Sequence, residues 1–163
     1  MSSEMRYYLI RRAREEGPPW VRIEDFARMN PFRPVVLVNG AFDILHSGHM
    51  KVIFAARRRG NTLVAALDSD EKVAASKGPG RPIQTWIERA TTLGYMPVDY
   101  LVEISSEEDM NQLIKTLKPE IRVQGGDYRG QKSRYPSVKK CFVFDCGMRT
   151  STIVERILKG EKR

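Results

Sequence analysis

His46 and His49 are the two histidines of the chain, and they lie on either side of Gly48 at the start of a helical pattern. They follow the apolar run VVLVNG, residues 35–40, which is typical of a strand covered on both faces. In an open parallel sheet, ligands bind beyond the carboxyl ends of the strands, where helix N-termini direct free N–H groups outward. Two imidazoles at such a point can donate hydrogen bonds to one anion. The pattern therefore predicts a phosphate site, in which Gly40 admits the ligand close to the backbone.

Each of these residues also has a simpler interpretation. A histidine next to a strand is usually a structural residue with its hydrogen bonds satisfied, and an Asn39-Gly40 pair is usually a turn. A His-x-x-His pair without a nearby carboxylate or thiolate is a poor zinc ligand set, so we expect no metal bound by the protein itself. The order of apolar strand, Gly-x-x-Asp, His-x-Gly-His and amphipathic helix favours the phosphate site.

Strands and helices must alternate to position this motif, and the sequence predicts that they do. Apolar or β-rich runs predict five strands, and capping residues with amphipathic patterns predict four helices. This alternation predicts an α/β fold with a doubly wound parallel sheet of about five strands. The expected strands cover residues 35–40, 62–70, 100–104, 120–127 and 140–145, and the expected helices cover residues 48–59, 85–93, 105–118 and 150–159.

Two segments do not follow the alternation. Residues 1–34 are basic and contain several prolines, and we expect an extension of two short helices that packs against the sheet of the main domain, residues 35–163. Residues 76–84, with the sequence SKGPGRPIQ, are rich in glycine, proline and basic side chains and predict a mobile loop.

The composition points to an anionic partner. The chain has 163 residues and a formal net charge of +8, which suits a nucleotide, a sugar phosphate or nucleic acid. The basic residues are dispersed and do not alternate with aromatic residues, which argues against nucleic acid as the main partner. No apolar run approaches the ~20 residues of a membrane helix, and no secretory signal is evident, so we expect a cytoplasmic protein. Cys141 and Cys146 are expected to remain reduced.

Several stretches in order resemble one family. GAFDILHSGH, residues 40–49, resembles the strand-loop-helix signature of the cytidylyltransferase-like nucleotidyltransferases, which implies a Rossmann-like sheet. Residues 64–104 also look like this family's second strand, its lysine loop (here residues 76–84, with Lys77) and the helix that follows. IRVQGGDY, residues 121–128, is similar to a strand end of bacterial heptose 1-phosphate adenylyltransferases, and RTSTIVERI, residues 149–157, resembles the helix start that closes the site. The resemblance covers about residues 21–158.

The resemblance implies transfer of a nucleotidyl group. A phosphorylated sugar or alcohol would attack the α-phosphorus of ATP or CTP and release pyrophosphate. Because the attacking phosphate is already anionic, catalysis would consist of positioning and charge neutralisation. Mg²⁺ would be carried by the nucleotide, and a homodimer is what the family suggests.

The resemblance also assigns roles to residues. The catalytic residues would be His46, His49 and Lys77. The nucleotide would be bound by Asn39, Gly40, Ala41, Phe42, Gly48, Arg89, Gln124, Gly125, Gly126, Asp127, Tyr128, Arg149, Thr150, Ser151 and Thr152, and the acceptor side by Asp43, Lys51 and Arg81.

Plain alternatives exist for several of these assignments. Lys51 would otherwise be a solvated charge, Arg89 an exposed arginine of an amphipathic helix, and residues 150–152 an ordinary N-cap. Gln124 stands where heptose enzymes usually have lysine, and Arg149 stands where relatives commonly show serine.

Three functions remain open from the sequence. The first is an adenylyltransferase that acts on a sugar phosphate such as heptose 1-phosphate. The second is a cytidylyltransferase that uses CTP and a polyol phosphate such as glycerol 3-phosphate. The third is a nucleotide-binding module without catalysis.

Overall fold

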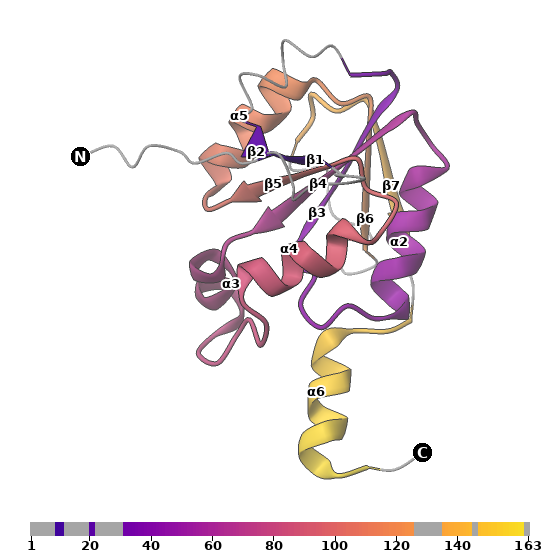
Figure 1. Cartoon of the computed structure of the whole chain (residues 1–163). Coiled ribbons are helices and arrows are strands. Elements are labelled where there is room, and N and C mark those ends of the chain that lie inside the picture. Colours follow the sequence, from indigo (N-terminus) through magenta and orange to yellow (C-terminus); the bar gives the residue numbers. More distant parts are fainter. Residues whose placement is uncertain (1–8, 12–19, 22–30, 126–134, 145–146, 162–163) are drawn as a thin grey trace, which may run out of the picture.

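The fold is built on one mixed sheet of seven strands, of which five neighbouring strands are parallel (Figure 1). The computed structural model describes residues 9–11, 20–21, 31–125, 135–144 and 147–161. Strand order in the sheet is β2-β1-β5-β4-β3-β6-β7, and β5, β4, β3, β6 and β7 run parallel. The parallel strands are β3 (Val35–Gly40), β4 (Thr62–Asp68), β5 (Tyr100–Ile104), β6 (Ile121–Gly125) and β7 (Lys140–Phe144). The predicted α/β class and the five parallel strands are confirmed.

The amino-terminal extension differs from its prediction where the structure describes it. Leu9–Arg11 forms β1 and Trp20–Val21 forms β2, so these residues are strands and not helices. β1 pairs antiparallel with β5 and with β2, which lengthens the sheet beyond its parallel part. An edge strand leaves unpaired backbone groups, and β1 satisfies those of β5. Residues 31–34 of the extension are neither helix nor strand, and residues 1–8, 12–19 and 22–30 lie outside the described residues.

Five helices belong to the described chain. They are α2 (Ser47–Arg57), α3 (Asp70–Lys77), α4 (Trp86–Gly94), α5 (Glu107–Leu117) and α6 (Thr150–Lys159). The predicted capping box is present at α4, where Thr85 and Glu88 satisfy each other's backbone N–H groups. Helix α3 was not predicted, because only Val73 of its residues is buried and the segment has no apolar stripe.

Two apolar layers hold the helices on the sheet. On one face, Val35 and Leu37 of β3 pack with Met110, Leu113 and other residues of α5. On the other face, neighbouring strand residues pack against α2 and α4. No helix among the described residues is long and apolar enough to cross a lipid bilayer.

The point where the chain changes faces lies between β3 and β6. After β3 the chain enters α2 on one face of the sheet. After β6, the described residues Tyr135 and Val138 pack on the opposite face, with α5. Two adjacent parallel strands that lead to opposite faces leave a crevice at their carboxyl ends, and this is where ligands bind in such folds.

Candidate active site

His46 is the N-cap of α2, and both of its ring nitrogens have partners. Its Nδ1 accepts a hydrogen bond from the backbone N–H of Gly48 at 3.1 Å. Its Nε2 lies 3.3 Å from Thr150 Oγ1, and Thr150 Oγ1 donates to the backbone oxygen of Asp43 at 2.9 Å. An Nδ1 that accepts leaves the proton of a neutral ring on Nε2, so Nε2–H donates to Thr150. His46 therefore connects α2 to the first residue of α6.

His49 is the more buried histidine of the pair. Its ring is stacked on that of His46, with centroids 3.9 Å apart and an interplanar angle of 27°, and it also contacts Phe42. Burial lowers the pKa of His49 to about 3, with smaller contributions from the charges of His46 and Lys77. Burial also lowers the pKa of His46. Both imidazoles are therefore neutral near pH 7 in the absence of a ligand.

The Nδ1 atom of His49 is buried and has no hydrogen-bond partner among the residues that the structure describes. A buried polar atom without a partner is destabilising unless a ligand or water satisfies it. The two histidines therefore form a site that is ready to exchange hydrogen bonds with a bound polar group.

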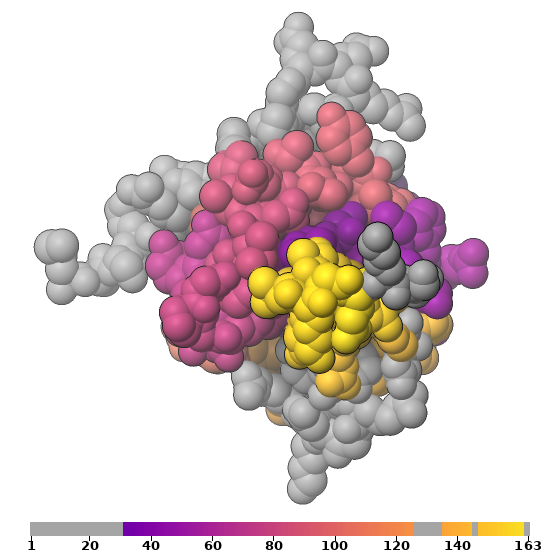
Figure 2. All heavy atoms as spheres, turned by 90° about the horizontal axis from the view of Figure 1, so that it is seen from below, coloured from indigo at the N-terminus to yellow at the C-terminus, as the bar shows by residue number. Residues whose placement is uncertain are grey.

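Gly48 is required for the close packing of this site. A Cβ at this position would lie 2.8 Å from Cε1 of His46 and 2.9 Å from the backbone oxygen of Met148. The glycine therefore lets the segment before α6 approach the start of α2. In Figure 2, α6 lies in the middle of this end of the molecule, between the α3–α4 region on one side and the purple segment with α2 on the other.

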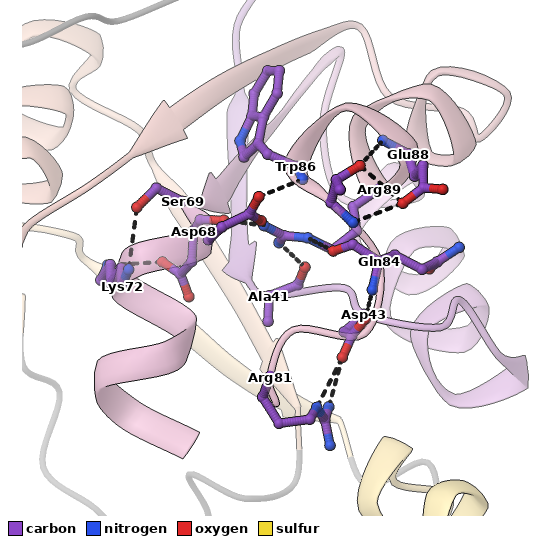
Figure 3. A network of polar contacts seen from close by, with 12 residues as sticks. Ala41, Asp43, Asp68, Ser69, Lys72, Arg81, Gln84, Trp86, Glu88 and Arg89 are labelled. Atoms are coloured by element: carbon purple, nitrogen blue, oxygen red, sulfur yellow. Dashed lines mark hydrogen bonds and ion pairs between the residues drawn. The ribbon is translucent and has the colours of Figure 1, made fainter. Parts of the chain in front are cut away.

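Asp43 anchors the carboxyl end of the loop 76–84. Its carboxylate is 1% exposed and accepts hydrogen bonds from the backbone N–H groups of Ile83 and Gln84. Arg81 forms an ion pair with it, with Nη2 to Oδ2 at 2.8 Å (Figure 3). Burial alone raises the pKa of Asp43, but the hydrogen bonds from Gln84 and Ile83 and the charge of Arg81 outweigh it and lower the pKa. The ion pair thus fixes the positions of Asp43 and Arg81, and both are positioning residues. Their contact with the acceptor stays a prediction.

Arg89 lies beneath the site and not on its surface. Its guanidinium donates to the backbone oxygens of Ala41, Gln84 and Asp68 and to the Asp70 carboxylate, and it has no exposed surface (Figure 3). The alternative of an exposed helix arginine is therefore wrong. A direct nucleotide contact is also not what the structure shows, because four acceptors of the fold already occupy the buried group. Arg89 is a positioning residue that joins α4 to the loops after β3 and β4.

Lys77 is exposed at the last position of α3, and it is followed by Gly78-Pro79-Gly80, whose two glycines have positive φ angles. Gly78 has φ 90° and Gly80 has φ 79°, and a Cβ at either position would meet nothing within 4 Å. The charge of Lys77 reaches His49, since it contributes to lowering the pKa of that ring. The structure thus places Lys77 in electrostatic range of the histidines, on a segment whose backbone depends on glycine.

The other predicted site residues are distributed over the same end of the sheet. Asn39 and Gly40 end β3, Gln124 and Gly125 end β6, and Arg149 is the N-cap residue of α6 without a side-chain capping bond. Ser151 and Lys51 are exposed on α6 and α2, and Thr152 is half-buried. Gly126, Asp127 and Tyr128 lie outside the described residues. Direct ligand contacts by all of these residues remain predictions.

Sequence reasoning missed Asp70 and Gln84. Asp70 accepts from Arg89 and from the backbone N–H of Trp86, while Gln84 Oε1 accepts from the backbone N–H of Ile44 at 2.8 Å. The run Ser69-Asp70-Glu71 was a signal for the first of these, because serine before acidic residues is typical of a helix start. Nothing in the local sequence marks Gln84.

These features agree with one protein family. The family profile described as cytidylyltransferase-like matches residues 37–150, and the chain therefore belongs to the cytidylyltransferase-like family. The match contains the histidine site, Lys77, Arg89 and the start of α6.

Among characterised proteins, the chain is similar to bifunctional protein HldE from several bacteria. It is 41% identical over 134 residues to that of Campylobacter curvus (strain 525.92), which covers 80% of this chain and 28% of the relative. It is 44% identical over 94 residues to that of Gluconobacter oxydans (strain 621H), covering 58% of this chain and 20% of the relative. The chain thus spans under a third of the length of these relatives.

A solved structure supports the fold alone. The crystal structure of the lipopolysaccharide core biosynthesis protein from Thermoplasma volcanium GSS1 is similar with a TM-score of 0.59 and 24% sequence identity. The similarity covers 68% of this chain and 96% of that chain.

Proposed function

We propose that this protein transfers AMP from ATP to the phosphate of a sugar phosphate of the heptose 1-phosphate kind. The observation that carries the proposal is the stacked pair His46 and His49 at the N-terminus of α2, with Thr150 of α6 against the first of them. Membership of the cytidylyltransferase-like family and the similarity to HldE proteins support the reaction class. A cytoplasmic location, which the sequence composition led us to expect, and a homodimer, which the family resemblance suggests, are part of this proposal.

In the proposed reaction, an oxygen of the acceptor phosphate attacks the α-phosphorus of ATP. A new P–O bond forms, the bond between the α-phosphorus and the bridging oxygen breaks, and pyrophosphate leaves with that oxygen. No proton has to be removed from the nucleophile, because the phosphate is already anionic. The chain has only to align the two groups and stabilise the charge that moves toward pyrophosphate.

The histidines supply hydrogen bonds in this scheme. Both rings are neutral before binding. His49 donates its N–H to a phosphate oxygen, and His46 does so when its N–H exchanges Thr150 for the phosphate. A bound triphosphate raises the pKa values of both rings by its own negative charge. Lys77 approaches from the glycine-rich segment and adds a full positive charge on the leaving pyrophosphate. Thr150 and the free N–H groups of α6 form the opposite wall.

We infer that Mg²⁺ would enter this site as a group carried by the nucleotide. The carboxylates of Asp43, Asp68 and Asp70 each pair with a cation of the chain, namely Arg81, Lys72 and Arg89. Among the described residues, no group of three potential ligands could hold a metal. A magnesium ion on the phosphates would neutralise their charge and leave this chain's residues to orient them.

Pyrophosphate release tests the proposal. ATP, CTP, GTP and UTP are each combined with heptose 1-phosphate, other sugar 1-phosphates and glycerol 3-phosphate in the presence of Mg²⁺. We expect turnover with ATP and a sugar 1-phosphate. Turnover with CTP and glycerol 3-phosphate instead would establish the cytidylyltransferase alternative, and nucleotide binding without any turnover would indicate a non-catalytic module.

Variants identify the catalytic residues in the same assay. His49→Ala should lower kcat by ~10²-fold or more, because it removes a hydrogen bond made to the transition state. Lys77→Ala should also lower kcat, whereas an effect limited to KM would mean that only ground-state binding is lost. Lys115→Ala, which removes an exposed charge of α5, is the control and should leave both constants unchanged.

A further inference from the structure

Arg122 of β6 is a buried cation at the crevice between β3 and β6. The residue is 3% exposed, and its Nε and Nη2 donate to Oδ1 of Asn39 at 3.0 and 2.8 Å. In the sheet, Arg122 is the neighbour of Leu37, two residues before Asn39 on β3. The side chain therefore extends along the sheet toward the carboxyl ends of the strands.

The charge of Arg122 is not matched within the described part of the chain. No carboxylate among the described residues forms an ion pair with it, and both of its hydrogen bonds go to one neutral amide oxygen. The ring of Tyr135 lies against the guanidinium, with 4.7 Å from Cζ to the ring centroid. A cation–π contact offsets only part of the penalty for removing a full charge from water. Arg89, by contrast, has a carboxylate partner.

Gln124 gives an independent indication of a ligand at the same place. It lies two residues after Arg122 on β6, so its side chain is on the same face of the sheet. The residue is 4% exposed, and its Oε1 is buried without a hydrogen-bond partner in the described structure. A buried amide that lacks a partner at the end of a strand indicates a group supplied from outside the chain.

The position separates these residues from the histidines. Val38 packs on the face of α2 and α4, so the next residue, Asn39, faces the side of α5 together with Arg122 and Gln124. The histidines begin α2 on the other side of the same crevice. A reaction that joins two phosphates needs two anion sites next to each other, one for each substrate.

We propose that Arg122, with Gln124 and Asn39, binds the phosphate monoester of the acceptor. This gives Asn39 and Gln124 the acceptor in place of the nucleotide, to which the family resemblance assigns them. The guanidinium supplies the charge, and its Nη1, which does not donate to Asn39, supplies N–H groups that a phosphate accepts. The Gln124 amide bonds a neighbouring hydroxyl of the same molecule. This inference rests on the proposed nucleotidyl transfer. Phosphate chemistry is shared by both substrates, and the tests therefore measure the acceptor and ATP separately.

The first test compares Michaelis constants of Arg122→Met with those of the unmodified protein. The KM for heptose 1-phosphate should rise about tenfold or more, as expected for the loss of a charge-assisted hydrogen bond, while the KM for ATP changes less than about threefold. Arg122→Lys should retain part of the affinity, because it keeps the charge. An equal rise in both constants, or a rise for ATP alone, would overturn the assignment to the acceptor.

Arg59→Met is a matched control. Arg59 also stacks on an aromatic ring, with Cζ 4.5 Å from the centroid of Phe142, but it lies at the other end of α2, away from the crevice. Its replacement should leave both Michaelis constants unchanged. If Arg122 only supported Asn39 structurally, Arg122→Met would lower thermal stability and leave the KM for the acceptor unchanged, which would contradict the proposal.

Direct binding separates this proposal from the proposed function. Heptose 1-phosphate and ATP are titrated separately into each protein, and binding is measured by calorimetry. Because only one substrate is present each time, no turnover can occur. The unmodified protein should bind both, and Arg122→Met should weaken the sugar phosphate about tenfold and leave ATP binding intact. If Arg122→Met weakens sugar phosphate binding in this way, but no pair of substrates releases pyrophosphate, the Arg122 site would be supported and the proposed transferase activity contradicted. Equal sugar phosphate binding by the two proteins, or none by the unmodified one, would overturn the subsite.

Discussion

Arg89 and Asp70 form an ion pair in which the arginine side chain is completely buried and the carboxylate is 39% exposed, with Nη2 to Oδ1 at 2.7 Å. The same guanidinium donates to three backbone oxygens that belong to different segments of the chain. One side chain thus fixes the loop after β3, the end of β4 and the start of α4. These segments carry the two histidines and both ends of the loop 76–84. The Arg89–Asp70 ion pair and its backbone hydrogen bonds therefore fix the positions of the site residues relative to one another.

Arg89→Met should destabilise the protein strongly. The variant fills a similar volume but leaves buried carbonyl oxygens without donors, and we expect a loss of about 3 kcal/mol in the free energy of unfolding. Chemical denaturation measures this loss. Asp70→Asn is the control: the amide oxygen still accepts from Arg89, and only the ionic charge and the hydrogen bond from the backbone N–H of Trp86 are lost, so the loss should be about 1 kcal/mol. Equal losses in the two variants would mean that the ion pair matters and the backbone bonds do not.

The sequence predicted the elements of the sheet because their patterns are local. Continuous apolar runs marked the buried strands, and Thr85 with Glu88 marked the start of α4. Helix α3 was not predicted, because it buries only Val73 and has no apolar face. It is stabilised instead by the Ser69 cap and by the acidic residues of its first turn. The strands β1 and β2 escaped because each is three residues or fewer, too short for an alternating pattern.

The candidate site was predictable where its chemistry lies in one motif. His46, Gly48 and His49 are contiguous, and the structure places them together at a helix start. The burial of Arg89 was not predictable, because its acceptors come from residues 41, 68, 70 and 84 and meet only in the folded chain. Arg122 was missed for the same reason, since a strand arginine gives no sign of its Asn39 partner.

The lowered pKa of His49 makes the stability of the protein depend on pH. In the unfolded chain this ring binds a proton below its ordinary pKa of 6.5, while in the folded protein it stays neutral down to about 3. The unfolded state therefore gains protons first, and stability is lost as the pH falls below 6.5. The slope should be up to about 1.4 kcal/mol per pH unit from this residue.

Denaturation of the unmodified protein and of His49→Gln between pH 7 and about 4.5 measures this effect. The glutamine does not titrate, so its curve should be flatter. Asp43 has a lowered pKa and loses its contribution only at lower pH, which keeps it outside this range. Parallel curves for the two proteins would show that His49 is not buried as a neutral ring. Saturating ATP should reduce the slope of the unmodified protein, because the phosphates favour the protonated ring.

Gly48→Ala should reduce turnover without unfolding the protein. The new Cβ would press on the His46 ring and on the backbone oxygen of Met148, and the ring would have to move away from Thr150. We expect kcat to fall about tenfold or more, because small displacements of a positioning group are costly for catalysis. Gly94→Ala on α4 is the control, since a Cβ there meets nothing within 4 Å. Similar kinetics in the two variants would contradict the close packing of α2 and α6.

Lys118→Gly should make the protein more stable. Lys118 follows α5 with φ 48° and ψ 57°, a left-handed conformation that disfavours side chains with a Cβ and favours glycine at helix ends. Its side chain is exposed, and its backbone oxygen accepts from Arg33, a bond that glycine keeps. We expect a gain of about 0.5–1 kcal/mol in the free energy of unfolding, after the greater flexibility of glycine in the unfolded chain is subtracted. Lys118→Ala retains the Cβ and should show no gain in the same denaturation experiment. A gain of equal size for alanine would mean that the charge of Lys118, and not its backbone conformation, limits the stability of this turn.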